Sequence, residues 1–302
     1  MLSIVVLGTA AGGGVPQWNC GCANCAAARN GHPELGATQA SIAVSHDREH
    51  WFLINASPDL RQQITQTPVL HPRAGRLRHS PIAGVILTNG EVDAIAGLLN
   101  LREGAAFNLY AHQRVLDILD ENPIFEALNR KLVKRRPVQI GAPFEPALPD
   151  GRAAGFTVEA FVAPGKVALF LEGRGDEAEG DTVGLVIRDN TGGQKLVFLA
   201  ACAEVTPAIK SLLEGADLVF FDGTLWRDDE MIRAGLSQKT GQRMGHIAMS
   251  AAMPALADLG IGKKVFLHIN NSNPALRDDS PERLELAAAG WVLPRDGMEL
   301  AL

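Results

Sequence analysis

The sequence predicts an α/β fold in which two β-sheets pack face to face and helices cover their outer surfaces. Three observations favour this architecture. Short apolar runs recur along the chain, each bounded by glycine, proline or asparagine, as is typical of strands. Segments with helical spacing of apolar residues lie between some of these runs. The two kinds of segment do not alternate strictly, as they would in a parallel doubly wound sheet, and helices are too frequent for an all-β protein.

The predicted strands are short runs rich in Val, Ile, Leu and Phe, which fit the half-buried surface of a sheet. The first run starts at Ser3, and the others follow at intervals through the chain. In order, the predicted strands are Ser3–Leu7, Ser41–Ser45, Trp51–Asn55, Gly84–Thr88, Asn108–Ala111, Thr157–Val162, Ala168–Glu172, Thr182–Arg188, Lys195–Leu199, Leu218–Asp222 and Lys264–Leu267.

The predicted helices lie between these strands and carry apolar residues three and four positions apart. In order, they are Pro58–Gln66, Val92–Arg102, Gln113–Asp120, Phe125–Leu132, Val205–Glu214, Ala248–Leu259 and Pro281–Ala289. No repeat of solenoid period is visible, and no change in composition marks a linker. Residues 1–302 are therefore expected to form a single domain.

Composition narrows the class of protein. The chain has 302 residues, of which 46% are apolar, so it can bury a sizeable core. Its formal net charge of −6 disfavours nucleic-acid binding, which needs a basic surface. No apolar run is long enough for a membrane span. The first residues, Met1–Gly8, lack a basic leader and a cleavage site, so they are interpreted as a strand. Clustered thiols without a signal sequence indicate a cytoplasmic protein.

Three loops stand out for their composition. The loop Thr67–Pro81 is basic and rich in proline; it is interpreted as a solvated loop, with a lid over substrate as the alternative. The acidic, glycine-rich stretch Glu172–Asp181 is expected to be a hairpin loop. The run Gly8–Gly14 follows the first strand, but Pro16 stands where a nucleotide-binding helix would begin. A glycine turn that lets the backbone pass close to a site is the preferred interpretation.

Three of the four cysteines crowd into six residues, as Cys20, Cys22 and Cys25. Three thiolates at this C-x-C-x-x-C spacing favour one soft metal ion, with zinc as the first choice. A disulfide would leave an odd thiol and need an oxidising compartment, and unligated loop cysteines are the third alternative. Three ligands are one short of a tetrahedral site, so the fourth must come from elsewhere in the chain. A structural clamp is therefore expected.

A second group of polar residues follows a buried strand. Glu91 and Asp93 come directly after the strand that ends at Thr88, on a turn that starts with Asn89. Two carboxylates at the end of a strand can ligate a hard or borderline cation. The alternative is that Asp93 or Asn89 caps the following helix, with Glu91 in its first turn.

Two further strands end in the same way. One ends in Asp222 and the other runs into His268, while His246 leads into a helix between them. Reactive groups gather at strand ends in open sheets. Burying acids and histidines costs free energy unless they are paired or ligated. The repeated pattern therefore favours one shared site over separate core residues.

At this point the residues resemble the metallo-β-lactamase fold, whose first metal motif is T-H-x-H-x-D-H-x-x-G-L. This chain keeps part of the frame, in Thr88, Asp93, Gly97 and Leu98. Where the motif has its three histidines, the chain has, in order, Asn89, Glu91 and Ala94. The resemblance implies an αββα sandwich.

The cysteine cluster resembles the structural zinc loop of the phosphonate-pathway cyclic phosphodiesterases of the same superfamily. The last metal motif of those enzymes is H-x-x-H, and here that stretch is His268-Ile269-Asn270-Asn271. The resemblance implies that His268 binds the active-site metal and that Asn271 takes the fourth position on the structural zinc. Since asparagine is a poor zinc ligand, the backbone, a water molecule or His32 are alternatives for that position.

Within the superfamily, the chain more closely resembles the coenzyme PQQ synthesis protein B family, and this resemblance spans the whole chain. Its most specific pieces are Gln17–Cys25, Thr88–Ala94 and His268–Pro274. The resemblance implies a role in the biosynthesis of pyrroloquinoline quinone (PQQ), which is made from a glutamate and a tyrosine of a peptide. Two roles are implied: iron-dependent hydroxylation of the tyrosine ring in a Glu-Tyr-derived precursor, and carriage of the product or a precursor toward the periplasm.

The ligands that a two-metal hydrolase of this fold needs are largely missing. The histidine expected after Thr157–Val162 falls near Pro164-Gly165, and the bridging aspartate falls near Ala201-Cys202. A dinuclear hydrolase is therefore not expected. The remaining candidates for ligands to one active-site metal are Glu91, Asp93 and His268. Fe²⁺ is the favoured ion, with Mg²⁺ and Mn²⁺ as alternatives.

Three more residues are candidates for catalysis around this metal. His246 suits a general acid or base, because an imidazole titrates near neutral pH, and Asp222 and Asn89 are expected nearby. The expected partner is a small-molecule or dipeptide precursor of PQQ. The sequence leaves open whether the chain forms a homodimer. A membrane span is not expected, which argues against unaided transport by a carrier.

Overall fold

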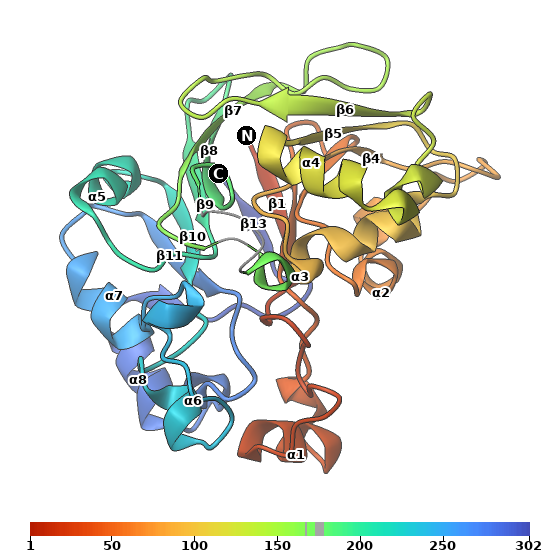
Figure 1. Cartoon of the computed structure of the whole chain (residues 1–302). Coiled ribbons are helices and arrows are strands. Elements are labelled where there is room, and N and C mark those ends of the chain that lie inside the picture. Colours follow the sequence, from red (N-terminus) through yellow and green to blue (C-terminus); the bar gives the residue numbers. More distant parts are fainter. Residues whose placement is uncertain (167, 173–177) are drawn as a thin grey trace.

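The computed structural model describes residues 1–166, 168–172 and 178–302. Two mixed β-sheets pack face to face, and helices lie on the outer face of each sheet (Figure 1). The predicted sandwich is therefore confirmed. None of the helices among the described residues is long and apolar enough to cross a membrane.

The first sheet has the strand order β13-β1-β2-β3-β4-β5-β6. Strands β13, β1, β2 and β3 pair antiparallel, and β3 to β6 pair parallel. The bounds are β1 Ser3–Gly8, β2 Ser41–Ser45, β3 Trp51–Ile54, β4 Ile82–Ile86, β5 Phe107–His112, β6 Val133–Val138 and β13 Glu299–Ala301.

The second sheet has the order β12-β11-β10-β9-β8-β7. Strands β7, β8 and β9 pair antiparallel, and β9 to β12 pair parallel. The bounds are β7 Phe156–Val162, β8 Val183–Asp189, β9 Lys195–Leu199, β10 Leu218–Asp222, β11 Lys263–Leu267 and β12 Trp291–Val292.

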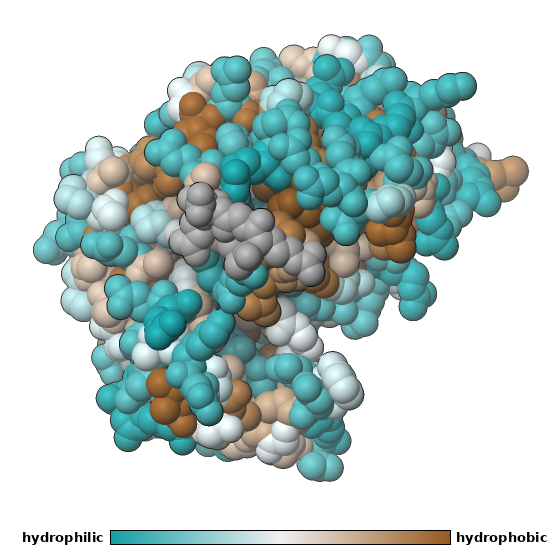
Figure 2. All heavy atoms as spheres, in the orientation of Figure 1, coloured by the Kyte–Doolittle hydropathy of each residue, from teal (hydrophilic) through white to brown (hydrophobic). Residues whose placement is uncertain are grey.

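The hydrophobic core has three layers, as expected where two sheets stack between helices. The middle layer lies between the sheets, where the rings of Phe52 and Phe156 meet edge to face at 5.3 Å. One outer layer packs α2, α3 and α4 on the first sheet, and the other packs α5, α7 and α8 on the second (Figure 1). Polar side chains cover most of the face shown in Figure 2.

The α-helices are short. Their bounds are α1 Ala23–Arg29, α2 Leu60–Gln66, α3 Val92–Ile95, α4 Gln113–Glu121, α5 Pro207–Leu213, α6 Glu230–Arg233, α7 Met249–Ala255 and α8 Pro281–Ala288. Two predicted helices differ in kind. The segment predicted as Val92–Arg102 passes from α3 into a 3₁₀ helix at Ala96–Leu101, and in place of Phe125–Leu132 there is a 3₁₀ helix at Pro123–Ala127.

One predicted strand is wrong. In place of Ala168–Glu172 the structure has a 3₁₀ turn at Leu169–Leu171. The apolar side chains that suggested a buried strand are instead substantially exposed, Leu169 by 58% and Phe170 by 39%. The loop Glu172–Asp181, expected to be a hairpin, lies partly outside the described residues.

The carboxyl ends of four strands bring the polar residues together. Strands β9, β10 and β11 run parallel, so their carboxyl ends meet at one edge of the second sheet. Strand β4 of the first sheet ends at the same edge, where the Val183 N–H donates to the Thr88 carbonyl at 2.8 Å. The exposed loop Thr67–Pro81 leads into the opposite end of β4. That placement fits a solvated loop and not a lid.

Candidate metal centres

The three clustered cysteines face one another where the segment after β1 enters α1, here called the cysteine loop; Cys20 and Cys22 precede the helix and Cys25 lies in its first turn. The Sγ atoms of Cys20, Cys22 and Cys25 lie within 4.8 Å of one another. Backbone N–H groups already donate to two of them, from Gln17 to Cys25 at 3.3 Å and from Cys22 to Cys20 at 3.4 Å. Such donors stabilise thiolates, the form that binds metal. The arrangement fits a soft ion such as zinc.

Asn271 occupies the fourth side of this cluster. Its buried side-chain amide lies 3.0 Å from the Sγ of Cys20, 3.5 Å from that of Cys22 and 3.3 Å from that of Cys25. The amide oxygen and nitrogen can exchange places by rotation, so the oxygen can also face the sulfurs. Of the alternatives for the fourth ligand, His32 is directed elsewhere, since its exposed ring pairs with Glu34 at 2.9 Å.

Asparagines connect the cysteine loop to the carboxyl ends of β10 and β11. The side-chain amide of Asn24, on α1, donates to the carbonyls of Asn271 at 3.0 Å and Asn273 at 2.9 Å. The Asn273 amide in turn donates to the Gly223 carbonyl at 3.1 Å. All three asparagines are buried. The cysteine loop is thereby tied to the segment that begins at His268.

The second centre is built around a contact between the two sheets. Asp93, on α3, places its Oδ2 atom 3.0 Å from Nε2 of His268, which follows β11. Burial alone would raise the pKa of Asp93, but the contact with His268 holds it below its usual value. Burial would lower the pKa of His268, but Asp93 raises it above its usual value.

Thr224 decides which nitrogen of His268 carries hydrogen. Its Oγ1 atom lies 2.7 Å from Oδ1 of Asp222, and a carboxylate can only accept, so the hydroxyl donates there. The same Oγ1 lies 2.9 Å from Nδ1 of His268 and must therefore accept from it. Nδ1 carries the hydrogen, and the Nε2 lone pair of the neutral ring points at Asp93.

Two acceptors that face each other at 3.0 Å need a cation between them. A proton serves this purpose in the metal-free protein, in agreement with the raised pKa of His268. A metal ion serves equally well, since cis ligands each about 2.1 Å from one ion lie about 3.0 Å apart. Imidazole and carboxylate donors together suit Fe²⁺, Mn²⁺ or Zn²⁺. The Asp93–His268 pair therefore fits an active-site metal.

Asp222 and His246 lie next to His268, on the side of Thr224. Nδ1 of His246 lies 2.8 Å from Oδ2 of Asp222 and 3.1 Å from Oγ1 of Thr224, and the rings of His246 and His268 stack at 5.2 Å. Ligand atoms of Asp222, His246 and His268 all lie within 4.8 Å of one another. The buried Asp222 also accepts from the Cys202 N–H at 2.8 Å. These bonds orient His246 with its Nε2 atom as a proton acceptor.

Glu91 and Asn89 lie close by but make other contacts. The Glu91 carboxylate accepts from the Leu169 N–H at 2.9 Å, and Asn89 accepts from the Glu91 N–H at 3.0 Å. Burial raises the pKa of Glu91. The structure therefore brings together two of the three predicted ligands, Asp93 and His268, while Glu91 is turned toward the backbone. Its role as third ligand stays a prediction.

The backbone of His268 is held in an uncommon conformation. Its φ angle is +62°, in the left-handed region that a residue with a side chain occupies at a cost. Backbone bonds on the next two residues fix it, from Ile269 to the Thr9 carbonyl at 2.9 Å and from Asn270 to the Thr224 carbonyl at 3.0 Å. This strained turn aims the imidazole across the gap between the sheets.

A cavity of about 740 Å³ opens over the second centre. Asn89, Glu91, Asp93, His246 and His268 all line it. The glycine turn after β1 forms part of the wall, where a side chain at Gly12 would touch the Asp93 carboxylate. This close approach supports the interpretation of that turn as a glycine turn next to a site.

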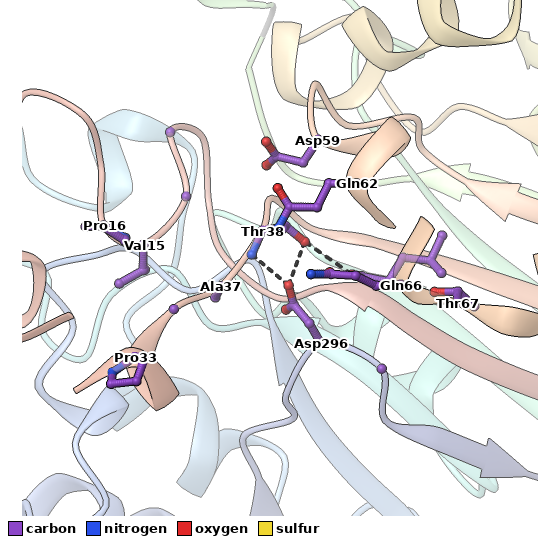
Figure 3. Close-up of a pocket in the computed structure, with 15 residues that line it drawn as sticks. Val15, Pro16, Pro33, Ala37, Thr38, Asp59, Gln62, Gln66, Thr67 and Asp296 are labelled. Atoms are coloured by element: carbon purple, nitrogen blue, oxygen red, sulfur yellow. Dashed lines mark hydrogen bonds between the residues drawn. The ribbon is translucent and has the colours of Figure 1, made fainter. Parts of the chain in front are cut away.

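A separate polar recess of about 620 Å³ lies on the other side of the glycine turn, and Gly13 lines both spaces. Figure 3 shows Asp296 reaching Thr38 there, where it accepts from the backbone N–H at 2.7 Å and from the hydroxyl at 2.6 Å. Gln39 connects the recess to the turn, donating to Asp59 at 2.9 Å and accepting from the Gly13 N–H at 3.0 Å. The contacts of Gln39 in this recess therefore hold the glycine turn that forms part of the cavity wall.

Thr224 was not among the residues predicted from the sequence. The signal available was its place two residues after Asp222, at the end of a buried strand.

Valine in place of Thr224 would keep the shape of the side chain and remove the hydroxyl. We expect Thr224→Val to destabilise the protein by about 2 kcal/mol, because Asp222 and both imidazoles lose a buried partner. Urea unfolding measures this, with Thr157→Val, which loses a more exposed bond to Asn190, as the control. Equal stability of the two variants would contradict the assigned hydrogen bonds.

Comparisons with known proteins agree with this fold. The model of the beta-lactamase superfamily domain matches residues 50–269. Coenzyme PQQ synthesis protein B of Rhodopseudomonas palustris is 62% identical over the full length of both chains, and that of Bradyrhizobium diazoefficiens is 60% identical over the same span. The crystal structure of Zn(2+)-bound PqqB from Methylobacterium extorquens superposes with a TM-score of 0.93 at 49% identity, covering 99% of this chain and 100% of that one. A diphosphatase of the PhnP family shares the fold, with a TM-score of 0.69 at 20% identity, covering 100% of this chain and 98% of that one.

Proposed function

This chain belongs to the coenzyme PQQ synthesis protein B family of the beta-lactamase superfamily, and from that membership we propose that it hydroxylates the tyrosine ring of a Glu-Tyr-derived precursor of PQQ. The reaction is proposed to use O₂ and one active-site divalent metal, with Fe²⁺ favoured over Mg²⁺ and Mn²⁺. The cysteine loop is proposed to hold a structural zinc, the ion named for the relative from Methylobacterium extorquens.

The observation that carries the proposal is the facing pair of acceptors, Asp93 and His268, at the floor of a large cavity. One imidazole and one carboxylate leave several positions on a metal open, as a reaction that joins O₂ and an organic substrate requires. A two-metal hydrolase would need the bridging aspartate, and at that position the chain has Ala201-Cys202. The donors present therefore favour oxygen chemistry over hydrolysis.

The residues around the pair have distinct parts in this proposal. Asp93 and His268 are proposed to hold the ion, with Glu91 as the expected third ligand. Thr224 holds the ring of His268 in the required tautomer. His246, oriented by Asp222, takes the proton of the substrate phenol on Nε2. When bound, Fe²⁺ would supply the electron transfer to O₂ that the reaction requires. One oxygen atom enters a ring C–H bond, and the other leaves as water with two electrons and two protons from an external reductant.

The test is a single-turnover assay with isotopically labelled O₂. Protein freed of active-site metal under anaerobic conditions is reloaded with Fe²⁺ and given a Glu-Tyr dipeptide, ascorbate as the reductant and ¹⁸O₂. We expect one labelled oxygen atom in the product by mass spectrometry, and none with His246→Ala at the same reaction time. A product without label would contradict the proposal.

The alternative role, a carrier that binds PQQ or its precursor without changing it, makes the opposite prediction in cells. A carrier needs the cavity but not the metal donors. If Glu91→Ala and His268→Ala strains make normal amounts of PQQ, the hydroxylase proposal fails and the carrier is favoured. Loss of PQQ in the His268→Ala strain, with normal protein abundance, supports the enzyme.

A further inference from the structure

Positive charge gathers at one end of the cavity, although the chain as a whole carries a net charge of −6. Lys166, in the segment after β7, and Lys239, in the loop after α6, both line the main cavity. A smaller adjoining recess of about 340 Å³ shares these two lysines and adds Arg243 and Glu172. Among the residues that the structure describes, the lining of this recess therefore contains three cations and one anion.

The carboxylate of Glu172 is held by both lysines at once. Lys166 Nζ lies 2.6 Å from one carboxylate oxygen and Lys239 Nζ lies 3.3 Å from the other. The two lysine hydrogen bonds lower the pKa of Glu172, so the group is anionic at neutral pH. Each oxygen of one carboxylate thus has its own ammonium donor, which is how a bound ligand carboxylate is held.

Apolar side chains line the same cavity as these cations and the metal centre. Val92 is 55% exposed, Leu169 58% and Phe170 39%, and all three line the cavity. Exposed large apolar residues that line a concave site beside a few polar groups are typical of a ligand-binding surface. They offer an apolar surface to an aromatic ring inside the cavity that Asp93 and His268 also line.

We propose that Lys166, Lys239 and Arg243 form a carboxylate-binding subsite, which Glu172 occupies as an internal competitor until an aromatic ligand with several carboxylates displaces it. The inference rests on the proposed function only for which end of the ligand reacts. Binding itself needs neither O₂ nor turnover, so it can be tested separately. Failure of hydroxylation with binding intact would count against the proposed function alone.

Glu172 provides the sharpest test, because its removal should improve binding. The probe is PQQ, an aromatic tricarboxylate, titrated calorimetrically into the full-length protein with its metals as purified. We expect Glu172→Gln to bind PQQ about threefold to tenfold more tightly than wild type, since two ammonium groups no longer need to leave an internal partner. A gain in affinity cannot result from misfolding.

Removing a cation of the subsite is expected to have the opposite effect and to weaken binding. Lys166→Gln and Lys239→Gln should each weaken PQQ binding about tenfold, and Arg243→Gln by a similar factor, as expected for lost charge-assisted hydrogen bonds. Lys210→Gln, an exposed lysine on α5, is the matched control and should bind as wild type does. The trimethyl ester of PQQ, which has no carboxylate charge, should show no difference among the variants.

Two results would overturn the subsite. One is unchanged or weaker PQQ binding by Glu172→Gln. The other is wild-type affinity in both lysine variants, or an equal loss of affinity for the ester, which would indicate a general change in the cavity. Thermal unfolding of each variant checks that the fold is kept.

Discussion

Replacing His268 with alanine is expected to lower the rate of precursor hydroxylation by at least about a hundredfold, the scale on which metal-site residues affect activity. His268 supplies one of the two facing acceptors and is the only one of the pair that contacts Thr224. Without the imidazole, the ion would lose one of its two facing donors. The measurement is the rate of ¹⁸O incorporation at saturating Fe²⁺.

The control for this prediction is His71→Ala, in the exposed loop Thr67–Pro81. That loop leads into the end of β4 away from the site, and the His71 ring bonds only the Thr65 carbonyl at 3.0 Å among the contacts in the described structure. We expect its rate to equal that of wild type. A His268→Ala rate within tenfold of the wild-type rate would show that His268 is not a ligand of the active-site metal.

Replacing Cys22 with serine is expected to lower zinc affinity by at least about a hundredfold, because a thiolate ligand is lost. The rest of the chain has its own cores, so the fold should survive while the segment of residues 17–30 loosens. Zinc per chain after dialysis against a weak chelator measures the first effect, and limited proteolysis measures the second.

Cys202→Ser is the matched control for this variant. Cys202 is fully buried, burial raises the pKa of its thiol to about 12, and its Sγ contacts the Glu204 carbonyl at 3.1 Å. It lies outside the cysteine loop, so this variant should keep its zinc. If Cys22→Ser also keeps one zinc per chain, the cysteines do not form the zinc site.

Much of the fold could be predicted because apolar periodicity marks buried strands directly. Strands β2, β9 and β10 have the predicted bounds. The edge strand β6 was not predicted, since half of its sequence Val133–Val138 is charged and it contains Pro137. Edge strands tolerate such residues because one side pairs with no neighbour. The strand forms because the adjacent β5 offers it a partner, which local sequence cannot show.

The site could be predicted in part, because its reactive side chains follow the carboxyl ends of strands. Asp222 and His268 end neighbouring parallel strands, so their meeting follows from the order of the strands. The directions in which the side chains of the site point could not be predicted. The turn of Glu91 toward Leu169 depends on a segment that the sequence suggested was a strand. Thr224 was missed because a hydroxyl becomes informative only once its three partners are known to surround it.

We infer that the cysteine loop positions His268 for an active-site metal through Asn24, Asn271 and Asn273. The most direct test is an anaerobic Fe²⁺ titration of wild type, Cys202→Ser and Cys22→Ser, with zinc content measured on the same samples. We expect Cys22→Ser, once depleted of zinc, to bind Fe²⁺ at least about tenfold more weakly than the other two proteins, as expected when a supporting contact to a metal ligand is lost. Equal Fe²⁺ affinity in zinc-depleted Cys22→Ser and wild type would show that the cysteine loop does not position His268.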